Sequence, residues 1–314
     1  MSKQIGVLRT VVTVAAAIAF VATWSSGFLI AAIATADADP LTLLVWRFAP
    51  LAVILLIATL LTGAAKGVTR RDLRTQASIG LLAQFGYCVA VYGAVATGIA
   101  TGTVALIDAV QPLVVAVLVG PLLGLRVRGS QWAGLAVGAV GVLLVVRSQF
   151  GSSDAAPVAY LLPAAAMACL IVGTFLQRRS AMRSEAQPGV LLTLTIHITA
   201  TALLLIVVGA ATGSLVPPAS ASFWIAVALT AVFPTLVAYG LYWWLLRRVG
   251  ITSLNALLFL IAPTTAFAGF LLLGEPLTLV TVAGFVLCGV GVAAVIIGEE
   301  KTRRAEKSAT PVSA

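Results

Sequence analysis

Three ionisable side chains that lie inside long apolar runs are the residues of this sequence most able to do chemistry. Arg47, Asp108 and His197 are each separated from the nearest polar segment by more than one helical turn. A charge at membrane depth is costly, so such groups face a partner or a water-filled cavity and mark ion or substrate pathways. These three residues are therefore the first candidates for a functional site.

Arg47 and Asp108 have opposite charges and lie at similar depths in two predicted helices. An ion pair between them is therefore expected. Two roles stay open: the pair holds two helices together, or it gates the site and releases Arg47 to a substrate. Proton coupling through Asp108 is the weaker option, because a carboxylate paired with arginine stays ionised and carries protons poorly.

His197 is the only histidine and lies near the middle of a predicted helix, 190–210. An imidazole at that depth can relay protons. The alternative, which we favour, is a histidine that is hydrogen-bonded to a neighbouring helix. Both interpretations stay open at this stage.

A polar patch surrounds a proline in the predicted helix 103–125. Asp108, Gln111 and Pro112 are three and four residues apart, so they share one helix face. Pro112 cannot donate a backbone hydrogen bond to the carbonyl group of Asp108. The patch is typical of a binding site or hinge, and the alternative is a kink that neighbouring helices satisfy.

Aromatic and small polar side chains supply further candidates for a cavity that takes a partly apolar solute. These candidates are Trp24, Ser25 and Ser26 in the first predicted helix, Gln84 and Tyr87 in the third, and Tyr239 and Tyr242 in the eighth. Pro263 in the ninth is a further candidate, as the proline that repeats Pro112.

Trp243 and Trp244 precede Arg247 and Arg248, and we expect the two tryptophans to lie in the interfacial belt of a membrane protein.

Long apolar runs must position all of these residues. The chain has 314 residues, of which 61% are hydrophobic and only 9% are charged. Its runs of roughly 18–24 apolar residues match the length with which a helix crosses the hydrocarbon core, and in lipid they must be helical. We predict an all-α integral membrane protein with ten transmembrane helices. The predicted helices are 11–34, 41–61, 77–96, 103–125, 129–146, 158–176, 190–210, 223–246, 254–274 and 277–297.

The placement of basic residues predicts the orientation. If the N-terminus is cytoplasmic and the sides alternate, all 19 Lys and Arg residues except Arg47 and Arg147 fall on the cytoplasmic side. Such a bias is what the positive-inside rule describes, and it places both termini in the cytoplasm. The first run, 11–34, has no clear cleavage site, so we predict a retained helix and no cleaved signal peptide. The expected location is the cell (plasma or inner) membrane.

Several function classes fit poorly. The net charge of +9 comes from short clusters between apolar runs, which favours topology signals over a nucleic-acid surface. Cys88, Cys169 and Cys288 lie inside apolar runs, and their spacing suits neither zinc nor a redox pair. The sequence has no P-loop, so it does not predict ATP hydrolysis. We expect no cofactor, no metal ion and no enzymatic activity.

The chain repeats one pattern. Ala105 and Pro112 recur at similar spacing as Ala256 and Pro263, and glycine-rich helices follow both. Five helices per repeat make the second copy enter the membrane from the opposite face, so we predict two inverted five-helix repeats with a substrate site between them. The predicted units are a first repeat at 10–150, a second repeat at 155–298 and a polar cytoplasmic tail at 299–314.

Several short motifs follow one another in a fixed order. They are Trp24-Ser25-Ser26-Gly27-Phe28, Pro40 with Arg47-Phe48, Pro112, Pro263, and Gly274-Glu275-Pro276-Leu277. This order resembles the drug/metabolite transporter superfamily and, within it, the EamA-type transporters, over roughly residues 10–298. The resemblance implies that the first, third, fourth, sixth, eighth and ninth helices surround a central cavity. One departure is Thr195, which takes the place in the second repeat that matches Arg47.

The sequence therefore predicts a secondary transporter that exports amino acids or related small metabolites or drugs by alternating access. Its expected partners are a small-molecule substrate and the lipid bilayer. A membrane-embedded lipid-modifying enzyme is the alternative, although short basic loops offer it few catalytic groups. The small-residue spacings Gly134–Gly138 and Gly284–Cys288 allow close helix packing, either within the monomer or in a homodimer.

Overall fold

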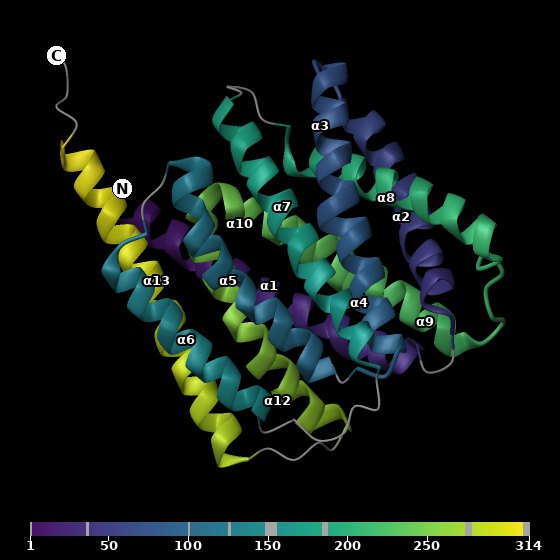
Figure 1. Ribbon diagram of the computed structural model, residues 1–314. Helices are drawn as coiled ribbons and strands as arrows, with labels where there is room; N and C mark the ends of the chain where they lie inside the picture. The colour runs from purple at the N-terminus through teal and green to yellow at the C-terminus, as the bar shows by residue number, and fades with distance from the viewer. Residues whose placement is uncertain are drawn as a thin grey trace.

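The computed structural model describes residues 2–35, 38–99, 101–124, 127–147, 156–183, 188–273 and 278–309. Its described elements are all helices, as predicted (Figure 1). Some helical residues, Asp108 among them, are described in their backbone but not in their side chains.

The helices follow one another along the chain with short connections. They are α1 (Ser2–Thr35), α2 (Pro40–Thr62), α3 (Arg70–Gly80), η1 (Leu81–Gly86), α4 (Tyr87–Ala96), α5 (Thr101–Leu123), α6 (Gly129–Arg147), η2 (Pro157–Tyr160), α7 (Leu161–Arg183), α8 (Val190–Thr212), α9 (Ala221–Thr230), η3 (Ala231–Val237), α10 (Ala238–Val249), α11 (Ile251–Leu257), η4 (Leu258–Leu260), α12 (Ile261–Leu273) and α13 (Leu279–Ala309). The elements η1 and η3 are π-helices, whereas η2 and η4 are 3₁₀-helices.

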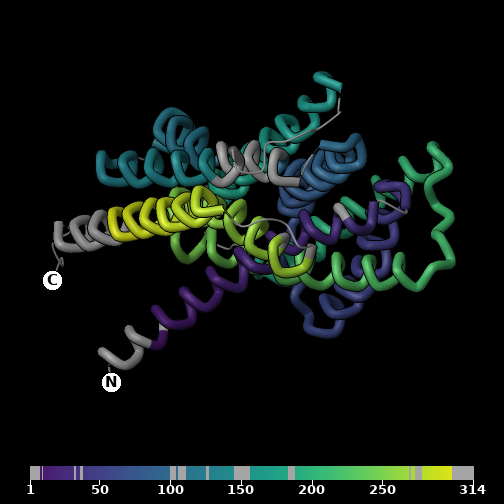
Figure 2. The backbone as a smooth tube through the Cα atoms, turned by 90° about the horizontal axis from the view of Figure 1, so that it is seen from below, coloured from purple at the N-terminus to yellow at the C-terminus, as the bar shows by residue number. Residues whose placement is uncertain are grey.

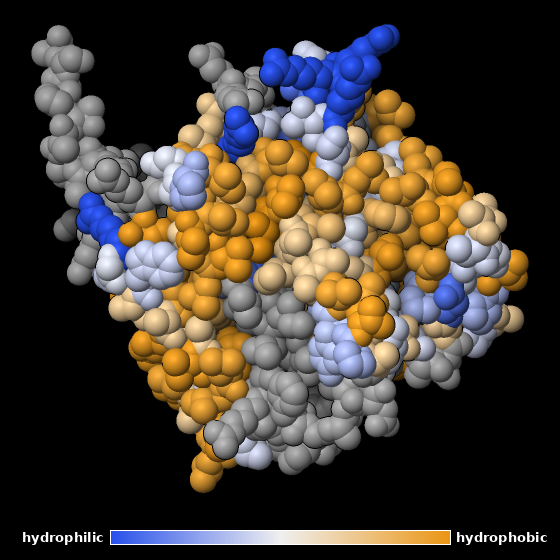
Figure 3. Space-filling view, viewed as in Figure 1, coloured by the Kyte–Doolittle hydropathy of each residue, from blue (hydrophilic) through white to orange (hydrophobic). Residues whose placement is uncertain are grey.

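Helix length and surface character agree with a membrane protein. Within the described residues, 8 helical stretches are long and apolar enough to cross a bilayer, and Gln111–Leu123 and Gly129–Leu144 are shorter apolar helices. Large hydrophobic side chains face outward, including Leu61 and Leu279, and they cover much of the visible surface (Figure 3). An all-helical, multi-pass membrane protein is therefore confirmed, while the number of ten crossings stays a prediction.

Local sequence explains how the membrane helices begin. Asp39 caps α2, because its carboxylate accepts a 2.9 Å hydrogen bond from the backbone N–H of Thr42, and Pro40 follows at the first helical position. A capping box of Thr69 and Asp72 starts α3. The helix that was predicted at 77–96 therefore begins earlier, at Arg70. Its first two turns are polar and precede the apolar run.

Two helices contain π-helical segments near their middles. Pro234 lies inside η3 and has no N–H to donate to the carbonyl group of Thr230. The hydroxyl group of Thr235 donates to that carbonyl instead, at 2.7 Å. The segment η1 lies between α3 and α4 in the first repeat, and η3 lies between α9 and α10 in the second. Segments of this kind often occur at functional sites.

Corresponding helices of the two predicted repeats lie against each other. The most extensive contact joins α6 with α13, and the next joins α2 with α8. A Cβ atom added to Gly134 would lie 2.7 Å from the carbonyl oxygen of Gly291, and one added to Gly141 would lie 2.7 Å from that of Gly284. These small residues therefore serve close packing within the monomer.

The described chain begins and ends on one side of the molecule. In both views the coloured beginning of α1 and the coloured last turns of α13 lie on the same side of the molecule (Figures 1 and 2). The helix α13 continues to Ala309, so much of the backbone of the predicted tail 299–314 is helical.

Candidate functional site

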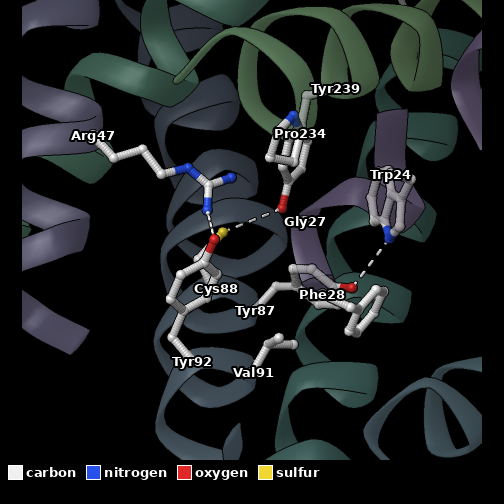
Figure 4. A pocket seen from close by; sticks show the side chains of 10 residues that line it. All are labelled: Trp24, Gly27, Phe28, Arg47, Tyr87, Cys88, Val91, Tyr92, Pro234 and Tyr239. Carbon is white, nitrogen blue, oxygen red and sulfur yellow. Dashed lines mark hydrogen bonds between the residues drawn. The ribbon is translucent and has the colours of Figure 1, made fainter. Parts of the chain in front are cut away.

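A small central cavity lies where α1, α2, α4, η3 and α10 meet (Figure 4). Its volume is about 30 Å³, which leaves room for a water molecule and not for a metabolite. The lining residues are Trp24, Gly27, Phe28, Arg47, Tyr87, Cys88, Val91, Tyr92, Pro234 and Tyr239. Among the described residues, the lining thus comes from the first, second, third and eighth predicted helices.

Arg47 brings a buried positive charge to this cavity. Its side chain is 2% exposed. Nε donates a 2.5 Å hydrogen bond to the hydroxyl oxygen of Thr235, and Nη1 donates a 2.8 Å bond to the phenol oxygen of Tyr92. The guanidinium also lies over the rings of Phe48, at 4.9 Å, and Tyr92, at 5.3 Å. All of these described partners are neutral, so the site favours an anionic ligand group.

Trp24 stands at the centre of an aromatic cluster beside Arg47. Its indole N–H donates to the phenol oxygen of Tyr87 at 3.2 Å. The Trp24 ring centroid lies 5.1 Å from that of Tyr239, 5.4 Å from that of Tyr242 and 5.3 Å from that of Phe20. These tilted and edge-on contacts fill the space into which a solute would otherwise enter.

The π-helical segments hold this cluster in place. The hydroxyl group of Tyr239 donates to the backbone carbonyl of Ala83, in η1, at 2.9 Å. Thr235, in η3, accepts the hydrogen bond from Arg47. Gly27 lets α1 approach η3, because a Cβ atom on Gly27 would lie 3.0 Å from that of Pro234. Both irregular segments therefore contribute directly to the geometry of the cavity.

The structure brings four of the predicted site residues, Trp24, Arg47, Tyr87 and Tyr239, to one cavity. Tyr242 packs behind Trp24, and its hydroxyl lies 2.5 Å from that of Thr174. It therefore supports the cluster from outside the cavity lining.

The two serines after Trp24 have other contacts. The hydroxyl of Ser25 donates to the backbone carbonyl of Ile261 at 3.4 Å, which joins α1 to α12. The hydroxyl of Ser26 donates to the carbonyl of Thr23, in its own helix, at 2.7 Å. Neither serine lines the central cavity.

Three predicted residues lie on other helix contacts. Pro263 lines an apolar groove between α1, α12 and α13. The amide nitrogen of Gln111 donates to the side-chain oxygen of Asn255 at 2.8 Å, which joins α5 to α11, and Pro112 is buried next to it. The side chain of Asp108 lies outside the described residues, so its ion pair with Arg47 stays a prediction.

Gln84 and His197 are fully buried where α3 and η1 pack against α8. Within the described chain, neither amide atom of Gln84 has a hydrogen-bond partner. Nε2 of His197 lies 2.9 Å from the amide oxygen of Gln76 in α3. A Cβ atom on Gly80 would lie 2.6 Å from Cα of His197. This arrangement supports the interpretation of His197 as a link between helices.

Trp243 corrects the expectation of an interfacial pair. It is 1% exposed, and its ring lies edge-on to His197 at 5.2 Å. Trp244 is half-buried and lies under the guanidinium of Arg248 at 5.0 Å. Neighbouring helical residues point about 100° apart, so only one of the two can face the core.

Sequence reasoning missed Cys88, Tyr92 and Asn255. Cys88 and Tyr92 are four residues apart, so they share a helix face that also meets Arg47. The sequence did contain a sign of this: a thiol and a phenol on one face of an apolar helix indicate a polar site within the membrane. Asn255 is likewise a polar amide inside an apolar run, and it directly precedes Ala256 of the repeated pattern.

The fold and the site define a class: a helical membrane protein whose helices enclose a small buried cavity lined by an arginine and aromatic rings. The model of the EamA-like transporter family matches residues 11–147 and 157–297, so the chain belongs to this family and contains two EamA repeats. It is a multi-pass membrane transporter of small molecules, as the resemblance implied.

Comparison with solved structures supports the same fold. One structure, titled "Crystal structure of protein", superposes with a TM-score of 0.73 over 92% of this chain and 98% of that chain, at 19% identity. Comparison with curated proteins gives no match.

Proposed function

We propose that the protein is a secondary transporter that exports amino acids or related small metabolites by alternating access. One observation carries the proposal: a desolvated arginine lies beside a cluster of tyrosine and tryptophan rings, between the two repeats. A guanidinium binds a carboxylate with two parallel hydrogen bonds, and aromatic rings accept an apolar side chain. Together they fit a zwitterionic or anionic solute with an apolar part.

Binding and movement are coupled in this scheme. The cavity of about 30 Å³ has no room for an amino acid, so the solute enters only when the cluster separates. Arg47 and Ala83 lie in the first repeat, whereas Thr235 and Tyr239 lie in the second. Opening breaks the Arg47–Thr235 and Tyr239–Ala83 hydrogen bonds, and the substrate carboxylate then replaces the lost partner of Arg47. Because the bonds join opposite repeats, rocking of the halves exposes the site.

The proposed topology has ten crossings, with both termini in the cytoplasm and the chain in the cell membrane. The positive-inside bias supports it. The start of α1 and the end of α13 on one side of the molecule support it as well (Figure 2). Pairing of α6 with α13 and of α2 with α8 fits two inverted repeats that meet at a central axis.

The test is solute flux in proteoliposomes that contain the purified chain. We expect uptake or release of some members of an amino-acid panel, without chemical change of the solute. Arg47→Gln should reduce the flux at least about tenfold, because it removes a charge-assisted pair worth about 1.5–3 kcal/mol. Arg74→Gln, an exposed arginine outside the cavity, is the control and should keep the flux.

Two outcomes would contradict the proposal. Full flux by Arg47→Gln would exclude a carboxylate site at Arg47. A modified lipid or solute, recovered by mass spectrometry, would instead support the lipid-modifying enzyme. Proton coupling is tested separately: an Asp108→Asn variant that keeps full dependence on a proton gradient excludes Asp108 as the coupling group.

A further inference from the structure

Two adjoining hollows flank the C-terminal part of α7, away from the central cavity. The first has a volume of about 420 Å³, lies between α3 and α7, and is lined mainly by polar residues, together with Ile79 and Leu176. The second has a volume of about 210 Å³, lies between α5 and α7, and is almost wholly apolar. Leu176 and Arg179 line both, so the two hollows adjoin at these side chains.

The polar hollow carries groups that bind phosphate. Arg71 enters from α3 and Arg179 from α7, and both side chains are exposed. Thr75 and Ser180 add hydroxyl groups, whereas the hydroxyl of Ser78 already donates to the backbone carbonyl of Arg74 at 2.9 Å. The guanidinium group of arginine can donate two parallel N–H hydrogen bonds to the oxygens of a phosphate, and hydroxyl groups can donate further hydrogen bonds to it.

One carboxylate also lines this hollow. Asp72 is already engaged in the capping box of α3. Its Oδ2 accepts hydrogen bonds from the backbone N–H of Thr69 at 3.1 Å and from the Thr69 hydroxyl at 2.7 Å. The two arginines therefore leave the hollow with a net positive charge, which is complementary to an anion.

The second hollow fits a hydrocarbon chain. Leu118 and Leu122 line it from α5, and Val172 and Phe175 line it from α7. Val172 lies seven residues before Arg179, which is about 10 Å along the helix, so the groove runs from the charged end toward the membrane interior. In Figure 3, hydrophilic residues gather over the upper ends of α3 and α7 and give way below to hydrophobic surface.

We propose that the two hollows together bind one anionic phospholipid of the cytoplasmic leaflet. Its phosphate lies between Arg71 and Arg179, and one acyl chain lies along Leu118, Leu122 and Val172. Basic pockets between membrane helices are known to hold anionic headgroups. The apolar continuation selects a lipid over a free phosphate ion, because a free ion would leave the second hollow unused.

This lipid would bridge the two repeats. Arg71 belongs to the first repeat and Arg179 to the second. The helix α3 leads into η1, which accepts the hydrogen bond from Tyr239, and α7 carries Thr174, which contacts Tyr242. A bound lipid therefore holds together two helices that support the aromatic cluster, and it stabilises the closed arrangement.

The experiment measures lipid binding to the purified full-length chain in a neutral detergent by native mass spectrometry. The probes are phosphatidylglycerol, phosphatidylcholine and inorganic phosphate. We expect phosphatidylglycerol to bind at least about tenfold more tightly than phosphatidylcholine, and inorganic phosphate to compete weakly. The double variant Arg71→Gln/Arg179→Gln should weaken phosphatidylglycerol binding roughly 10- to 30-fold, since it removes the charge-assisted hydrogen bonds of two guanidinium groups to the phosphate, whereas an arginine outside the hollow makes no such bond.

A matched control removes two charges elsewhere. Arg70→Gln/Arg74→Gln changes exposed residues that line neither hollow, and it should change the affinity less than about twofold. Val172→Trp fills the apolar hollow and should weaken phosphatidylglycerol binding, but not inorganic phosphate binding. Equal affinity for both lipids, equal losses in the two double variants, or no effect of Val172→Trp would each overturn the proposal. None of these readouts depends on transport, so the proposal can fail while the transport function stands.

Discussion

Arg47 shows how one residue defines the central site. A buried guanidinium needs acceptors, and Tyr92 and Thr235 supply them together with the ring faces of Phe48 and Tyr92. Among the described side chains, its hydrogen-bond partners are neutral oxygens, which satisfy its geometry without neutralising its charge. The residue is therefore held in place and yet still attracts an anion, which is the combination a carrier needs for reversible binding.

Tyr92→Phe tests this balance. The change keeps the ring but removes the oxygen that accepts from Arg47, so the free energy of unfolding should fall by about 1.5–3 kcal/mol. A carboxylate substrate should restore part of the lost stability, because it supplies the missing acceptor. Thermal unfolding in detergent, with and without substrate, measures both effects. Tyr160→Phe, at a half-buried tyrosine in η2, should behave as the unmodified chain. No loss of stability in Tyr92→Phe would exclude the role assigned to its hydroxyl.

His197 can be tested with two substitutions. His197→Gln keeps a side chain that can hydrogen-bond to Gln76, so both stability and gradient-driven flux should stay close to normal. His197→Leu leaves a buried amide without its partner and should lower stability by about 1–3 kcal/mol. If both variants instead lost gradient-driven flux while remaining folded, His197 would be a proton relay and the structural interpretation would be wrong.

At the scale of elements, glycine contacts determine how closely helices approach. Gly134 and Gly141 let the backbones of α6 and α13 touch over a long contact. Lipid offers no hydrophobic force between helices, so their association depends on such close packing. The α6–α13 pair is therefore a closely packed contact between the two repeats.

Gly134→Ala should weaken this pair. The added Cβ atom would lie 2.7 Å from the carbonyl oxygen of Gly291, and overpacking of this kind costs about 1–3 kcal/mol. Gly289→Ala in α13 is the control, because a Cβ atom there meets nothing within 4 Å. Thermal unfolding should separate the two variants, and equal melting temperatures would show that the helices repack without cost.

Sequence predicted the helices well because lipid leaves no other backbone structure. It found Arg47 because a charge in an apolar run is conspicuous. The sequence did not reveal the π-helix η1, since one extra residue in a helical turn changes neither the hydropathy nor the length of the apolar run. Pro234 marks η3, but a proline alone does not distinguish a kink from a π-helix. Trp243 was placed at the surface because hydropathy cannot tell which of two adjacent tryptophans faces inward.

At the scale of the whole molecule, the proposed topology makes a direct prediction. Tags at both chain ends should report the same, cytoplasmic side, because an even number of crossings returns the chain to its starting face. Protease protection in intact cells and in inverted vesicles measures this. Opposite locations of the two ends would remove the inverted-repeat arrangement and the alternating-access mechanism that depends on it.

The two halves also differ in one respect that bears on transport. Thr195, the counterpart of Arg47, forms a 2.7 Å hydrogen bond with Thr59 in the contact between α2 and α8, and it takes no part in the cavity. In the proposed mechanism, a solute bound through its carboxylate therefore contacts the first half, through Arg47, from entry until release. In that mechanism the second half moves relative to the bound solute, so a substitution that slows its motion should lower the turnover rate and leave the substrate affinity unchanged.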